Sequence, residues 1–190
     1  ENPPSQLPLS FSQQRLWLID QLEGGSSHYN MPVALQVDGM FDVVAAEKAL
    51  NTILARHEVL RTVYKQAGET VYQEVQTDVS VPFSMHDLQG MKMQSQREAI
   101  QSKLTEDARA HFDLSTDVML RGSWLQQSAT QGVLLFNIHH IASDGWSMSV
   151  LVDEFNQLYQ AYAQGMDNPL AGLTLQYSDY ALWQQEELVG

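Results

Sequence analysis

Residues 138–147 hold the densest set of side chains able to do chemistry, because two histidines, Ser143 and Asp144 follow one another there. The stretch begins where an apolar run ends. An imidazole at the exit of a buried strand can have its pKa moved in either direction from about 6.5, the range that general base catalysis needs. Asp144 could return to orient His140, and free N–H groups at the next helix start could bind an oxyanion. These residues therefore predict a base, an orienting carboxylate and an anion site in one loop.

Three other interpretations use the same residues. A hydrogen-bonded pair of core histidines followed by an Asp-Gly turn would need no catalytic role. His139, His140 and Asp144 are acceptable metal ligands, although adjacent histidines on a strand point to opposite faces. Ser143 could be a nucleophile, but its neighbourhood does not have the turn that exposes one. Residues 145–149 begin like the G-x-S-x-G motif of hydrolases, but Ser149 replaces its last glycine. The residue pattern alone leaves catalysis and a core histidine pair both open.

Composition narrows the class of protein. The chain has 190 residues, 44% of them hydrophobic, which is enough for one globular domain or two small lobes. A formal net charge of -13 argues against nucleic acid and anionic membranes as partners. The absence of cysteine removes disulfides and thiolate sites and is compatible with a reducing compartment, so we expect a cytoplasmic location. Because the first residue is not Met, we expect a piece of a longer protein.

Hydrophobic periodicity predicts the elements that position the histidines. Apolar residues at helical spacing indicate helices over residues 11–22, 42–56, 94–111, 147–164 and 178–188, with Asp42 as an N-cap. Alternating or continuous apolar residues indicate strands over residues 33–37, 60–65, 70–75, 119–126 and 133–139. Strands and helices intermix without strict βαβ alternation, so we predict an α/β fold, a two-layer sandwich with a mixed β-sheet.

Four segments, in order, resemble motifs of the condensation domains of nonribosomal peptide synthetases. Residues 139–145 are similar to the family's His-His-x-x-x-Asp-Gly motif, and residues 9–17, 56–62 and 177–183 resemble its first, second and fourth motifs. Together these matches span essentially the whole chain. The histidine motif is shared with wider acyltransferases of the chloramphenicol acetyltransferase type, so the resemblance implies a lobe with that fold.

The resemblance implies amide bond formation between two thioesters, each on the phosphopantetheine arm of an upstream or downstream peptidyl carrier domain, with no cofactor bound directly. His140 would be at the chemistry, as a general base or as a hydrogen-bonding orienter of the amine, and His139 would support packing. Gly145 would keep the loop close to the donor carbonyl. Asp144 is expected to form a structural ion pair with Arg61, with Arg56 as the alternative.

The chain is shorter than the family's two-lobed domain. The resemblance assigns residues 1–175 to the N-terminal lobe and residues 176–190 to the start of an inter-lobe linker helix, with the C-terminal lobe absent. We therefore expect the isolated lobe to be inactive and its inner surface to be unusually apolar. The motifs favour condensation over epimerization or heterocyclization, with an L-configured donor. The alternative function is a non-catalytic module that docks carrier proteins.

Overall fold

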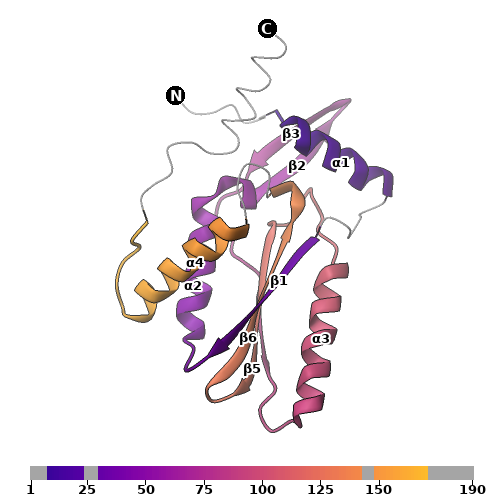
Figure 1. The fold of residues 1–190 in the computed structure, drawn as a ribbon. Coiled ribbons are helices and arrows are strands. Elements are labelled where there is room, and N and C mark those ends of the chain that lie inside the picture. Colours follow the sequence, from indigo (N-terminus) through magenta and orange to yellow (C-terminus); the bar gives the residue numbers. More distant parts are fainter. Residues whose placement is uncertain (1–7, 24–29, 143–147, 171–190) are drawn as a thin grey trace.

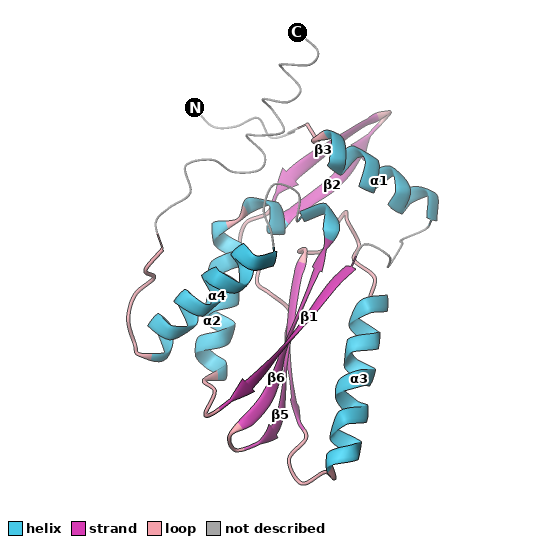
Figure 2. Ribbon diagram, in the orientation of Figure 1, coloured by secondary structure: helices cyan, strands magenta, loops and turns pink. Residues whose placement is uncertain are grey.

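The computed structural model describes residues 8–23, 30–142 and 148–170, which form a mixed α/β fold (Figures 1 and 2). The helices are α1 (Phe11–Glu23), α2 (Val43–Arg56), α3 (Met93–Arg109) and α4 (Met148–Ala163), with short 3₁₀ helices η1 (Glu58–Arg61) and η2 (His140–Ala142). The strands are β1 (Asn30–Asp38), β2 (Thr62–Ala67), β3 (Thr70–Val75), β4 (Phe83–Asp87), β5 (Leu120–Ser128) and β6 (Gln131–His139). The predicted helix over residues 178–188 lies outside the described residues.

The main sheet of the described residues has the strand order β1-β6-β5-β4. Strand β6 pairs antiparallel with both β1 and β5, whereas β4 pairs parallel with β5. This confirms the predicted α/β fold with a mixed β-sheet. Strands β2 and β3 form a separate antiparallel hairpin. Strand β6 is therefore central in the sheet, as its apolar sequence predicts, and it ends at His139.

Helices cover both faces of the sheet, as Figure 2 shows. Leu134, Phe136 and Ile138 of β6 belong to the larger core, which also holds the buried sides of α2 and α4. Val133 and Leu135 point to the other face and form a smaller core against α3. The alternation of side chains along β6 thus divides its apolar residues between two cores. By the same alternation, His139 at the end of β6 lies on the α3 side of the sheet.

Helix α2 begins and packs as the sequence predicts. The Asp42 carboxylate accepts a hydrogen bond from the Ala45 N–H at 3.0 Å, which satisfies one of the free donors of the first turn. Leu50 and Ile53 are fully buried in the larger core. The N-cap and the apolar stripe together fix where α2 starts and which side it turns to the sheet.

One local prediction was wrong. Leu60 and Arg61 lie in the 3₁₀ helix η1 instead of the strand predicted over residues 60–65, and β2 starts only at Thr62. On α3, Ala108 is exposed and Asp107 is the buried residue of the last turn. The Asp107 carboxylate pairs with Lys103 at 3.1 Å, which compensates its burial.

Gly132 gives a direct test of how tightly β5 and β6 pack. A Cβ at Gly132 would overlap the six-membered ring of Trp124, which is 1% exposed and stacks on Phe41 at 4.2 Å between centroids. We expect Gly132→Ala to lower the free energy of unfolding by about 1–3 kcal/mol, because the buried ring must move. Chemical denaturation measures this. In a Trp124→Leu background the same substitution should cost less, because only the 2.9 Å approach to the Leu125 carbonyl oxygen remains. An equal cost in both backgrounds would refute the clash with the ring.

Candidate active site

The two adjacent histidines lie in different environments at the end of β6. His139 is the last residue of the strand and is 1% exposed, whereas His140 begins η2 and is exposed. The change from strand to 3₁₀ helix between them turns the second imidazole outward. The structure therefore presents one ring to solvent beside one ring that is enclosed. His140 can be approached by a small molecule, and His139 cannot.

The enclosed ring of His139 holds the turn that carries His140. Its Nδ1 atom accepts a hydrogen bond from the Ile141 N–H at 3.0 Å, so the ring proton of the neutral form lies on Nε2. Phe112 packs edge-on against the ring, with centroids 5.8 Å apart. Desolvation by burial lowers the pKa of His139 to about 4, and the charges of His140 and His111 add to the effect. The ring is therefore neutral at neutral pH, the state in which Nδ1 can accept this bond.

Two asparagines anchor the same end of the sheet to the end of α3. Asn137 of β6 donates through Nδ2 to the Asp107 carbonyl at 2.7 Å, and Asn30 of β1 donates to the same carbonyl at 3.2 Å. In the sheet register Asn30 lies opposite His139. The Asp107 carbonyl also accepts a hydrogen bond from the Ala110 N–H. It lies in the last turn of α3, where the regular helical hydrogen bonds end. They fix the strand end that leads into the histidine pair.

The arginines of the second motif make separate contacts. Arg61 donates to two backbone carbonyls, from Nη1 to Gln76 at 2.8 Å and from Nη2 to Ala55 at 3.2 Å. Arg56 Nε donates to the Glu154 carboxylate at 2.8 Å. Asp144 and Gly145 lie outside the described residues. The ion pair between Asp144 and Arg61, with Arg56 as its alternative, therefore stays a prediction.

Glu154 is a buried polar residue that reasoning from the sequence missed. It is 7% exposed on α4, and its second carboxylate oxygen lies 2.6 Å from His57 Nε2. The available signal was its position three residues after Leu151 and four before Leu158, which places an acid on the buried side of the predicted helix. Its partners could not be read from any short window, because both come from the distant end of α2.

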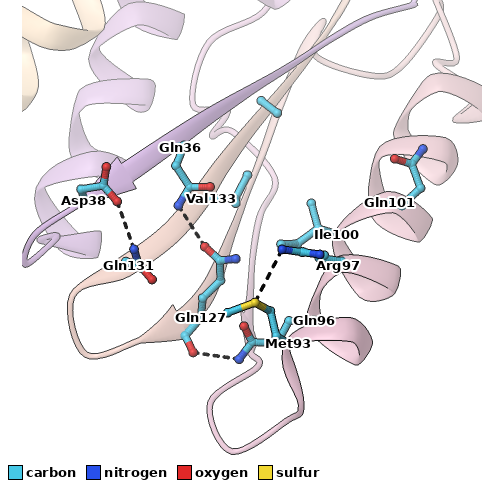
Figure 3. A pocket seen from close by; sticks show the side chains of 11 residues that line it. Gln36, Asp38, Met93, Gln96, Arg97, Ile100, Gln101, Gln127, Gln131 and Val133 are labelled. Atoms are coloured by element: carbon cyan, nitrogen blue, oxygen red, sulfur yellow. Dashed lines mark hydrogen bonds between the residues drawn. The ribbon is translucent and has the colours of Figure 1, made fainter.

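Other features of the described residues lie apart from the histidines. A cavity of about 610 Å³ lies between α3 and the sheet, lined by Gln36, Gln96, Gln127 and Gln131 among others. Figure 3 shows how these side chains lie. Gln131 and His139 are the two ends of β6, about 26 Å apart along the strand, so this cavity is not the histidine site. No group of three metal-ligating side chains occurs among the described residues. No helix in the described ranges has both the length and the apolar character to cross a membrane.

The sequence is similar to nonribosomal peptide synthetases. The family model for the condensation domain matches residues 5–189. Chondramide synthase cmdD of Chondromyces crocatus is 39% identical over 180 residues, which cover 95% of this chain and 5% of that protein. The dimodular nonribosomal peptide synthase of Bacillus subtilis is 37% identical over 97% of this chain and 8% of its own length. The chain thus spans a small fraction of these relatives.

Solved structures agree with the sequence comparison. The X-domain from teicoplanin biosynthesis has a TM-score of 0.87 and 32% identity, covering 100% of this chain and 40% of that one. The starter condensation domain of rhizomide synthetase RzmA has a TM-score of 0.86 at 18% identity, over 98% of this chain and 45% of its own, and shows the shared fold. The predicted lobe of the chloramphenicol acetyltransferase type is confirmed. With the family match over nearly all its length, this chain belongs to the condensation domains of nonribosomal peptide synthetases.

Proposed function

We propose that the chain is the histidine-bearing N-terminal lobe of a condensation domain, formed by residues 1–175, with residues 176–190 starting the link to a second lobe. Condensation domains of nonribosomal peptide synthetases form amide bonds by acyl transfer between carrier-bound substrates. The observation that carries the proposal is the exposed His140 at the end of a buried central strand, next to the enclosed His139. An isolated lobe would be inactive, because the site would lack its facing wall.

The reaction needs one proton acceptor beside the nucleophile. The amine of the acceptor aminoacyl thioester attacks the carbonyl carbon of the donor acyl or peptidyl thioester. The C–N bond forms, the C–S bond breaks, and the proton lost by the amine ends on the leaving thiolate of the donor arm. His140 accepts a hydrogen bond from the amine, either removing its proton or orienting it. Each effect is worth roughly 10²–10⁴ in rate, so His140 is the residue on which the rate depends.

Three further residues support this arrangement. Asp144 forms a structural ion pair with Arg61 or, as the alternative, with Arg56, because a buried carboxylate without its guanidinium would cost about 3–5 kcal/mol. Gly145 lets the backbone approach the donor carbonyl where any side chain would obstruct it. His139 acts through the backbone of the turn and does not touch substrate.

An exposed apolar face of α1 supports the two-lobed proposal. Phe11, Leu18 and Leu22 follow one another at helical spacing and are 42%, 53% and 77% exposed. Large apolar side chains exposed together on one helix are typical of a surface that a partner covers. This proposal assigns two kinds of partner to the surface that would face the second lobe. They are the second lobe itself and the phosphopantetheine arms of the upstream and downstream carrier domains.

A non-catalytic docking module is the second candidate function. The teicoplanin X-domain, 32% identical to this chain, has been solved in a complex with OxyB, which shows that a related domain binds a protein partner. A docking lobe would bind a carrier domain without promoting a reaction. In that case the exposed His140 would have no chemical role.

The isolated chain mixed with aminoacyl-loaded and peptidyl-loaded carrier domains should form no dipeptide above background, because one wall of the site is missing. A complete condensation domain that contains this sequence should form product, measured by mass spectrometry. Robust turnover by the 190-residue chain alone would contradict the two-lobed proposal. Binding of a labelled carrier without product, even in the complete domain, would establish the docking module instead.

His140→Ala in the complete domain should lower the rate of dipeptide formation by roughly 10²–10⁴-fold, because the amine loses its hydrogen-bond acceptor. The melting temperature should change little, because the side chain is exposed. The exposed His86 provides a matched control, whose substitution by Ala should leave the rate unchanged. A large loss of melting temperature with His140→Ala would make its role structural.

His139 should make the stability of the chain depend on pH. Because burial lowers the pKa of His139 from 6.5 to about 4, the unfolded state binds the proton at a higher pH than the folded state. The contribution of neutral His139 to the free energy of unfolding is therefore complete above pH 6.5. As the pH falls toward 4, the free energy of unfolding decreases by on the order of 3 kcal/mol. Chemical denaturation across this range measures the loss.

His139→Asn separates this titration from others. The asparagine oxygen can accept the Ile141 N–H bond and does not titrate, so the variant should lose less stability than wild type as the pH falls. His86→Asn, at an exposed histidine, should keep the wild-type pH dependence. Parallel curves for wild type and His139→Asn would show that burial of this ring does not govern its protonation.

A further inference from the structure

A buried carboxylate outside the histidine motif joins α4 to the end of α2. Glu154 is 7% exposed, and its two oxygens lie 2.8 Å from Arg56 Nε and 2.6 Å from His57 Nε2. A carboxylate this deeply buried is stable only when it is paired and hydrogen-bonded. Here each oxygen has its own partner. The geometry fixes both the position and the rotation of this turn of α4.

Both partners of Glu154 belong to a rigid junction. Arg56 is the last residue of α2, and His57 is its C-cap, with its backbone N–H bonded to the Ile53 carbonyl at 3.0 Å. The chain then passes through η1 into β2. Figure 1 shows α2 and α4 side by side. Glu154 therefore attaches α4 to a point whose own backbone is already hydrogen-bonded.

Most of the remaining described contacts of α4 are apolar. Phe155 packs edge-on against Phe136 of β6 with centroids 5.2 Å apart, and Leu151 and Leu158 are buried in the same core. Apolar packing of this kind does not select a single register along the helix. Two other polar contacts lie farther along α4. The hydroxyls of Tyr162 and its α2 neighbour Thr52 are 2.8 Å apart, and the Tyr159 hydroxyl accepts a hydrogen bond from the Asp42 N–H at 2.9 Å. Of these polar contacts, the Glu154 pair is the one nearest in sequence to the first turn of α4.

The first turn of α4 depends on this attachment. Helix α4 begins at Met148, six residues before Glu154, which is about 9 Å along the axis. On the other side of the connection, His139 fixes the turn of η2 that carries His140. The turn that carries His140 is therefore held by His139, and the helix that begins at Met148 is held by Glu154.

We propose that Glu154 is a positioning residue for the reaction, which holds the first turn of α4 at the distance from His140 that the transition state requires. This inference rests on the proposed function. A misplacement of about 1 Å at a reacting centre can cost 10²-fold in rate, so the loss of one anchor has a large effect on kcat. Substrate binding, which involves other surfaces, is affected little.

The test compares three variants in the complete condensation domain. Glu154→Ala removes both contacts. Glu154→Gln keeps the shape, because its oxygen can accept from Arg56 and its amide N–H can donate to His57. Tyr162→Phe removes only the polar contact between the same two helices at the far end of α4, and serves as the matched control for stability. Dipeptide formation gives kcat and KM, and thermal unfolding gives Tm.

We expect Glu154→Ala to lower kcat about 100-fold with KM changed less than about threefold, and Glu154→Gln to recover most of the loss. Tyr162→Phe should lower Tm without lowering kcat. If Glu154→Ala does not fold, His57→Phe, which removes one of the two contacts, takes its place and should lower kcat more than Tyr162→Phe does. The inference would be overturned if Glu154→Ala, or His57→Phe in its place, had the kcat of the wild type. It would also be overturned if that variant lost no more kcat than Tyr162→Phe.

The outcomes also distinguish this inference from the proposed function. If the wild-type complete domain forms no dipeptide, the proposed function fails. If the wild type forms product and Glu154→Ala retains its kcat, only the positioning role of Glu154 fails.

Discussion

The hydrogen bond from the Ile141 N–H to His139 Nδ1 determines how the central strand ends. Strand β6 is buried along almost its whole length and ends at His139. The bond closes a short turn in which His139 stays inside and His140 emerges. It requires the neutral imidazole, and burial lowers the pKa of His139 to about 4 and thereby supplies that state. Burial of the first histidine and exposure of the second are thus two results of one contact.

Both cores of the molecule support that strand end. One face of β6 packs on α2 and α4, and the other packs on α3, so the strand cannot tilt toward either side without opening a core. Asn30 and Asn137 bind the Asp107 carbonyl, which adds a polar anchor on the α3 side. Glu154 adds a second anchor on the α4 side. Directional polar contacts thus anchor the end of β6 and helix α4, and apolar packing fills the two cores.

The features that local sequence encodes were predicted, and those that depend on distant partners were not. The apolar run of β6, the Asp42 cap of α2 and the histidine motif are visible in short windows, and the structure has the strand and the cap as predicted. Strand β4 was missed, because three of its five residues are exposed and it is held by parallel pairing with β5. The partners of Glu154 were missed because they are 97 and 98 residues away.

The central claim is that His140 alone of the pair meets the attacking amine. The most direct measurement is a structure of the complete domain with a stable analogue of the acceptor substrate on its carrier arm. The account predicts the amine nitrogen within about 2.6–3.2 Å of the His140 ring, with His139 still bonded to the Ile141 N–H and out of contact with substrate. An amine bound away from His140, or a His140 ring turned into the core, would contradict it.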